Sequence, residues 1–422
     1  MGSDEEQIVF GHERLGKIYP KGMLKSLETK EEKVIRYDKK NLPIGVDNFN
    51  RPYILNFEHP TRILIIGKPR SGKSWILHAL ADRLAFFYAV IYLNDCKREF
   101  YTSRFLLQEQ YRHLLLPGEK PRRRKVISLR PTIFEKMDGG ILEEYDHWYS
   151  ENPSTLKKVD LMTLLDVPSI SSQATKNCFQ LLFEEMEKEF EGREKEFRIE
   201  WLLNKIEMME DWTDSQKTAV KMRIKPLMTS NFYKPENEID IVELMKKGFI
   251  PAINFKKFDE FYGSNFNPPP VLYSLILRKV ANARVKKEIP EVWVLIDEAE
   301  RFLSSERESC SRFQTIETVG LSASSGMSLV ICSQLISRLP KEIVSQCRYT
   351  FIPYNIDIPT LTECLKLCGA LKTQQNAYNE ARRLKSQMGK WQWIVIDRDN
   401  PNKTITIIRA LPPLSHHKES RE

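Results

Sequence analysis

The segment that most constrains this chain is a glycine-containing loop between an apolar run and a helical pattern. The loop reads GKPRSGKS (67–74) and satisfies the pattern G-x-x-x-x-G-K-[ST]. RILIIG (62–67) leads into it, and WILHALADRLAFF (75–87) follows it with helical periodicity. Two glycines at this spacing let the backbone wrap tightly, so that successive N–H groups point at a bound phosphate. Strand, loop and helix in this order indicate a phosphate-binding loop rather than a glycine turn without function.

The residue types of this loop have separate expected roles. Lys73 is expected to reach the β- and γ-phosphates of a nucleotide, and the Ser74 hydroxyl is expected to bind Mg²⁺. The positive end of the following helix adds to the attraction for phosphate. We therefore expect ATP and Mg²⁺ as ligands. The predicted nucleotide-binding residues are Gly67, Lys68, Pro69, Arg70, Ser71, Gly72, Lys73, Ser74 and Trp75.

A second apolar run, VWVLIDEAERF (292–302), supplies acids at the end of a predicted buried strand. Asp297 is expected to hold the metal, partly through water, and Glu298 to orient the attacking water. Ligands of open α/β sheets bind at this end of the strands. The alternative is a solvated Asp-Glu pair at the start of a helix, where acids are favoured anyway.

A third strand, SLVICSQ (328–334), ends in Gln334, which could touch the γ-phosphate and report hydrolysis. The alternative is an amide that bonds only to the backbone of its own loop. Glu298, Gln334 and Lys73 are the predicted catalytic residues. No NKxD motif occurs to recognise guanine, which weakens the interpretation as a GTPase.

The pattern along the chain predicts a doubly wound α/β domain interrupted by a helical insertion. The predicted divisions are an N-terminal extension with short strands (1–60), a core (61–100 and 240–411), a helical insertion (101–239) and a C-terminal tail (412–422). Two stretches near or inside the insertion, KVISLRP (125–131) and IPAINFKKF (250–258), could be added strands. A hairpin over 390–411, turning at Asp399, Asn400 and Pro401, is expected to close the core.

Taken together, these motifs resemble those of the HerA/FtsK superfamily of ring-forming, DNA-translocating ATPases, with the HerA side closer. The segment PIGVDNFNRPYILNFEHPTRILIIGKPRSGKS (43–74) is similar to the family's lead into its phosphate loop. Asp95-Cys96-Lys97-Arg98-Glu99-Phe100 resembles Asp-Pro-His-Gly-Glu-Tyr, and IDEAERF resembles Ile-Asp-Glu-Ala-His-Arg-Phe. LMKKGFIPAINF (244–255) and GMSLVICSQLISRLPKEIVSQCRYTFI (326–352) are similar to the family's later strands. The resemblance covers roughly residues 43–100 and 240–411.

This resemblance implies a RecA-like core with a mainly parallel sheet, assembled as a homohexamer around double-stranded DNA. Two departures stand out. Residues 320–325, where the family usually places an arginine finger, contain no basic side chain. Arg312, Arg338 and Arg348 are the alternative candidates, each of which could equally be a surface ion-pair partner. Only about 60 residues precede the loop strand, so the family's N-terminal barrel, which docks a nuclease partner, is expected to be shortened or absent.

Composition sets the broad class of protein. A chain of 422 residues, 41% hydrophobic and 29% charged, fits a globular protein and excludes collagen, a coiled coil and disorder. The net charge of +8 fits a polyanionic partner without requiring one. The densest basic run, Arg122, Arg123, Arg124 and Lys125, is a candidate DNA contact, with a solvated loop as the alternative. Without a signal sequence or an apolar run of roughly 20 residues, we expect a cytoplasmic protein with no transmembrane segment of its own.

Three functions remain open from the sequence. The first is an ATP-driven motor that translocates double-stranded DNA, in DNA processing, transfer or genome packaging. The second is an ATPase motor for protein secretion or pilus assembly, working with a membrane-channel partner. The third is a slow ATP-dependent switch, because an arginine finger can contribute 10³–10⁵ to turnover and its location here is open.

Overall fold

The structure is a computed structural model of the chain. It describes residues 6–8, 35–58, 60–94, 100–117, 119–142, 145–190, 198–261, 266–306, 309–371, 373–400 and 405–417. The predicted Asp95–Glu99 pattern, most of the N-terminal extension and residues 418–422 lie outside these ranges.

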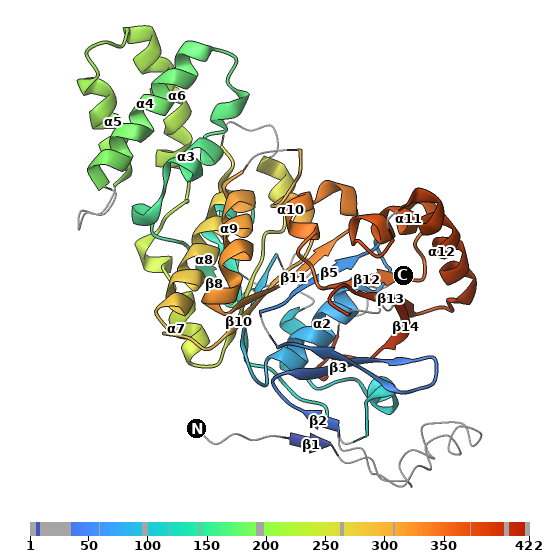
Figure 1. Cartoon of the computed structure of the whole chain (residues 1–422). Helices are drawn as coiled ribbons and strands as arrows, with labels where there is room; N and C mark the ends of the chain where they lie inside the picture. The colour runs from blue at the N-terminus through green and yellow to red at the C-terminus, as the bar shows by residue number, and fades with distance from the viewer. Residues whose placement is uncertain are drawn as a thin grey trace.

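Twelve strands of the described chain form one sheet, which crosses the middle of the molecule (Figure 1). Their spatial order is β4 (Pro52–Asn56), β3 (Asn41–Asp47), β14 (Ile405–Ala410), β13 (Gln392–Asp397), β12 (Tyr349–Pro353), β5 (Arg62–Ile66), β11 (Met327–Ser333), β10 (Val292–Ile296), β6 (Ala89–Leu93), β9 (Ile250–Ile253), β7 (Val126–Pro131) and β8 (His147–Tyr149). The eight strands from β12 to β8 are parallel, and the first four pair antiparallel. The mainly parallel α/β sheet is as predicted.

The central strands are buried and mostly apolar because both of their faces are covered. Alternate residues of β5 enter different clusters: Ile63 and Ile65 belong to the one that includes α2 (Lys73–Leu84), and Leu64 and Ile66 to the other. The second cluster includes α8 (Pro268–Val285). Figure 1 shows α2 on one side of the sheet, and α8 and α9 on the other.

The remaining helices complete this second layer and form a separate group. They are α3 (Lys158–Leu164), α4 (Gln173–Phe190), α5 (Ile199–Met208), α6 (Asp214–Thr229), α7 (Ile241–Lys246), α9 (Cys310–Ser325), α10 (Lys341–Val344), α11 (Ile358–Leu367) and α12 (Gln374–Gln387). Helices α3 to α6 lie together at one end of the molecule in Figure 1. None of the described helices is long and apolar enough to cross a membrane.

The sheet also contains strands from outside the predicted core ranges. β7 and β8 lie within the range predicted as a helical insertion, and β7 falls on the stretch 125–131 singled out as an added strand. β3 and β4 precede the loop strand and join the sheet through β14. The predicted C-terminal hairpin is confirmed as β13 and β14, while Pro401 of its turn is outside the described residues.

The segment after β14 packs along α2 through a buried polar network. The ring of His78 on α2 bonds to the Ser103 hydroxyl and lies 3.0 Å from a ring nitrogen of His417. The Ser415 hydroxyl donates to the Asp82 carboxylate at 2.7 Å, and the Ser415 N–H donates to the same oxygen. These bonds hold the C-terminal segment against the helix that begins at the phosphate loop.

Titration of His78 should make the stability of the protein depend on pH. Burial chiefly lowers the pKa of His78 from 6.5 to about 3, against the opposing effect of Asp82 and with His417 and Arg124 lowering it further. Below pH 6.5 His78 is therefore protonated in the unfolded chain but stays neutral in the folded chain, so the free energy of unfolding falls as the pH decreases. We expect a loss of up to about 1.4 kcal/mol per pH unit from this group.

Chemical denaturation between pH 7 and 5 measures this effect. His78→Gln, which cannot titrate, should show a flatter dependence of the unfolding free energy on pH than the wild type. Parallel curves for the two proteins would contradict the assignment.

Candidate nucleotide-binding site

The predicted phosphate loop connects β5 to α2, and its first glycine fits a space with no room for a side chain. The Gly67 N–H donates to the Ser333 carbonyl at 3.1 Å, which ties the loop to β11. A Cβ at Gly67 would lie 2.5 Å from the Ser71 hydroxyl oxygen and 2.7 Å from Cγ of Pro353. Gly72 has a φ of 90°, a conformation that favours glycine. Both glycines of the motif are therefore required by the backbone.

Lys73 folds back over this loop. Its ammonium group donates to the carbonyl oxygens of Gly67 at 2.6 Å and Lys68 at 3.0 Å, and the residue is only 9% exposed. The buried Ser71 hydroxyl oxygen has no hydrogen-bond partner among the described residues. Both the Lys73 ammonium and the Ser71 hydroxyl can donate to phosphate oxygens, so the loop offers hydrogen-bond donors to an anion bound at its centre.

The outer part of the loop is exposed at Lys68, Pro69 and Arg70. The Lys68 ammonium pairs with Asp357 at 2.7 Å, and this bond, followed by those from Thr360, holds the pKa of Asp357 well below its usual range. Asp357 also caps α11 by accepting from the Thr360 N–H at 2.9 Å. The loop is therefore anchored to a helix from a distant part of the chain.

Trp75, included among the predicted nucleotide-binding residues, packs against other parts of the protein. Its indole N–H donates to the Leu411 carbonyl at 3.1 Å, and its ring lies edge-on to Tyr111 with centroids 5.0 Å apart. These contacts give Trp75 a role in holding α2 against the C-terminal segment.

The predicted acids follow β10 at the same end of the sheet as the loop. Asp297 accepts the Glu298 N–H at 2.9 Å, and Glu298 has a φ of 47°, which is uncommon for a residue with a side chain. The Glu298 carboxylate pairs with Arg301 at 2.7 Å, and Arg301 in turn lies 3.3 Å from Asp259. The unusual backbone conformation and the ion pair with Arg301 together fix the orientation of the Glu298 side chain, the predicted base.

The end of β11 lies between the loop and these acids, because β11 pairs with both β5 and β10. The Gln334 N–H donates to Oε1 of Glu300 at 3.3 Å. Burial chiefly raises the pKa of the Cys332 thiol, and the charges of Asp297, Lys73 and Glu300 all act on it. The phosphate loop, the predicted acids and the predicted sensor therefore meet around the ends of three neighbouring strands.

The arginine-finger candidates lie in two places. The Arg312 guanidinium donates to the Ser305 carbonyl at 3.4 Å, and the Arg338 carbonyl accepts from the Ser305 N–H at 2.8 Å, so these two candidates lie close together. Arg338 is exposed. Arg348 precedes β12 at the opposite end of the sheet and pairs with Asp397 at 3.4 Å and Asp399 at 3.5 Å.

The basic run divides by environment. Arg124 bonds to the backbone and carboxylate of the buried Asp82, and Arg122 and Arg124 both lie over the ring of Phe86. Arg123 and Lys125 are exposed. Half of the run therefore contributes to packing on α2 and on Phe86 just after it, and half faces solvent.

Glu300 and Arg301 are site residues that the sequence did not single out. Both follow the acids by two or three positions, and the only available signal was the unusual charge density of DEAER. Neither the Glu300 contact to Gln334 nor the Arg301 contact to Asp259 can be predicted, because each joins residues 34 or more positions apart.

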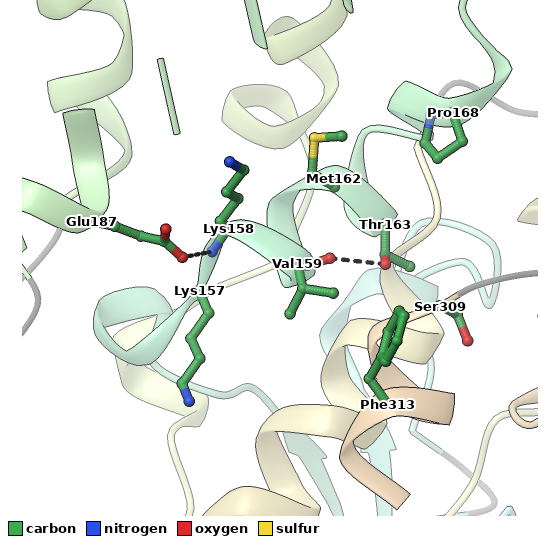
Figure 2. A pocket seen from close by; sticks show the side chains of 9 residues that line it. All are labelled: Lys157, Lys158, Val159, Met162, Thr163, Pro168, Glu187, Ser309 and Phe313. Carbon is green, nitrogen blue, oxygen red and sulfur yellow. Dashed lines mark hydrogen bonds between the residues drawn. The ribbon is translucent and has the colours of Figure 1, made fainter. Parts of the chain in front are cut away.

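A cavity of about 380 Å³ lies away from these strand ends, between α3, α4 and α9 (Figure 2). Its lining includes Lys157, Met162, Thr163, Glu187 and Phe313. None of the predicted nucleotide-site residues lines it.

Comparison with solved structures identifies the fold. VirB4 of Thermoanaerobacter pseudethanolicus aligns with a TM-score of 0.56 at 12% identity, over 88% of this chain and 97% of VirB4. The bacterial conjugative coupling protein TrwBΔN70, solved with sulphate, aligns at 0.51 and 13% identity, over 99% of both chains. The chain therefore has the same fold as these two proteins. No family model matches the sequence, and no curated protein matches it. The predicted RecA-like fold class is confirmed.

Substitution of Gly67 tests the geometry of the loop. Gly67→Ala places a methyl group against Ser71 and Pro353, so the loop must open, and we expect at least a tenfold weaker affinity for ATP. Gly389→Ala is the matched control, because its new methyl group would meet only ordinary contacts, at 3.5 Å or more. Titration with a fluorescent ATP analogue measures both. Unchanged affinity in Gly67→Ala would contradict this account.

Proposed function

We propose that this protein is an ATP-hydrolysing, ring-forming motor that translocates double-stranded DNA. The observation that carries the proposal is the meeting of Lys73, Asp297, Glu298 and Gln334 at three adjacent strand ends. This is the arrangement that phosphoryl transfer to water needs: donors for the phosphates, an oxygen ligand for a cation and a carboxylate for the water.

In the proposed reaction, the loop N–H groups bind the β-phosphate and the Lys73 ammonium leaves its two carbonyl partners for the phosphate oxygens. Ser74 and Asp297 offer hydroxyl and carboxylate oxygens, the ligand type that Mg²⁺ prefers, and would hold it. Bound Mg²⁺ would neutralise charge on the phosphates. Glu298 accepts a proton from the attacking water, whose oxygen bonds to the γ-phosphorus while the bond to the β–γ bridging oxygen breaks and ADP leaves. Gln334 lies beside the γ-phosphate.

Arg301 bears on the activity of Glu298. In the described structure the Arg301 guanidinium pairs with the Glu298 carboxylate at 2.7 Å, so one carboxylate oxygen is already engaged in an ion pair. We propose that Glu298 exchanges this partner for the water when the site is filled. A basic side chain from a neighbouring subunit would complete the site, with Arg312 and Arg338 as the candidates and Arg348 held by its two acids.

A DNA motor must contact phosphates without reading bases, because it has to move over every sequence. Arg123 and Lys125 are exposed and are the proposed contacts from the basic run. A homohexameric ring around the duplex, and docking of a nuclease or a membrane-channel protein, complete the proposal. The likeness to TrwB, a bacterial conjugative coupling protein, supports a role in DNA transfer.

The alternative is a motor for a protein substrate, or a slow ATP-dependent switch. The absence of a basic side chain in residues 320–325 and the ion pair between Glu298 and Arg301 favour slow turnover in the isolated subunit. The polymer that stimulates hydrolysis separates these functions.

Steady-state ATP hydrolysis with and without linear duplex DNA tests the proposal. We expect at least a tenfold stimulation by duplex, since assembly on DNA would bring the neighbouring arginine into the site. Glu298→Gln should lower the DNA-stimulated rate of ATP hydrolysis at least 100-fold. Intact nucleotide binding with no stimulation by duplex would contradict the DNA motor and favour a protein motor or a switch.

The double variant Arg123→Ala/Lys125→Ala locates the DNA contact in the same assay. It should leave the basal rate unchanged and raise the DNA concentration needed for half-maximal stimulation, more so at high salt. Arg124→Ala serves as a contrast, because loss of its ion pair to buried Asp82 should lower the unfolding free energy by about 3 kcal/mol.

A further inference from the structure

The Glu300 carboxylate is bonded on one side only. Its Oε1 accepts the Gln334 N–H at 3.3 Å, whereas its Oε2 is buried and has no hydrogen-bond partner among the described residues. A buried carboxylate oxygen without a donor is unfavourable, because burial removes the water that would otherwise bond to it. The position of Glu300 therefore implies a further donor in another state of the site.

Apart from the Ser71 hydroxyl of the phosphate loop, the neighbouring donors of Arg301, Lys73 and Cys332 already have partners. Arg301 pairs with Glu298 and Asp259, and the Lys73 ammonium bonds to the carbonyls of its own loop. The Cys332 thiol bonds to Asp297. None of these groups can serve Glu300 without giving up an acceptor.

The side-chain amide of Gln334 is the remaining donor on a residue already in contact with Glu300. The backbone bond fixes the start of this side chain beside the carboxylate. In the described part of the chain, the Gln334 side chain makes no hydrogen bond, and the residue is half-buried. A free donor and a free acceptor thus belong to two residues that are already joined.

We propose that Glu300 is a positioning residue that orients the Gln334 amide for ATP hydrolysis. When nucleotide binds, Oε1 keeps the backbone N–H of Gln334 and Oε2 accepts its side-chain N–H. The amide oxygen of Gln334 then faces the site and accepts a hydrogen bond from the attacking water. Glu300 takes up no proton, since Glu298 receives the proton of the water. This inference rests on the proposed function.

A carboxylate differs from an amide at this position in one decisive respect. Glu300→Gln retains an oxygen that accepts the Gln334 N–H, but it places an NH₂ donor where Oε2 stands. Two NH₂ groups then face each other, so the Gln334 amide must flip and present its own NH₂ group to the water. The substitution therefore removes orientation while it conserves shape and the backbone anchor.

Kinetics of Glu300→Gln, Gln334→Ala and the double variant test the proposal. We expect Glu300→Gln to lower kcat about tenfold with KM within threefold of the wild type, and to have no further effect in the Gln334→Ala background. Glu291→Gln is the matched control at the opposite end of β10, where Glu291 pairs with Lys39 at 2.7 Å, and should keep the wild-type kcat.

Two kinetic results would overturn the proposal: a kcat of Glu300→Gln within twofold of the wild type, or full additivity with Gln334→Ala. A crystal structure with a non-hydrolysable ATP analogue gives a readout that does not depend on turnover. A bond between the Gln334 side-chain nitrogen and Glu300 Oε2 would support the proposal, and a Gln334 side chain turned away from Glu300 would overturn it. A wild-type protein that binds but does not hydrolyse ATP would contradict the proposed function instead. The crystal structure would then still show whether Glu300 binds the Gln334 side chain.

Discussion

The narrow space around Gly67 is the constraint on which the nucleotide site depends. The loop closes against the end of β12 and against its own Ser71, so that a single methyl group would force it open. Its N–H bond to Ser333 ties it to β11, and the pairing of β11 with β10 brings in the acids. The geometry of the site therefore follows from strand order and from close contacts of backbone rather than from long flexible side chains.

The same helix that begins at the loop is fixed from the other side by the C-terminal segment. Trp75 bonds to the Leu411 carbonyl, and His78 and Asp82 bond to residues 415 and 417. Arg124, from the basic run, also ends on Asp82. Charged and polar residues that might have been assigned to a ligand are thus used to hold the loop's helix in place.

The local part of this structure could be predicted from sequence. The loop, its flanking strand and helix, and the acids after β10 lie in short stretches whose residue types reflect local geometry. Long-range pairing could not be predicted: the approach of β3 to β14, like the addition of β8 to the sheet, depends on contacts between distant segments. Trp75 shows the same limit within the motif, because its partner lies 336 residues away.

The direct test of the central claim is the identity of the nucleotide that each protein retains after incubation with radiolabelled ATP and Mg²⁺. The account predicts that the wild type retains mainly ADP, that Glu298→Gln retains ATP, and that Lys73→Ala retains neither. Retention of nucleotide by Lys73→Ala in the amount that the wild type retains, or conversion of bound ATP by Glu298→Gln at the wild-type rate, would contradict it.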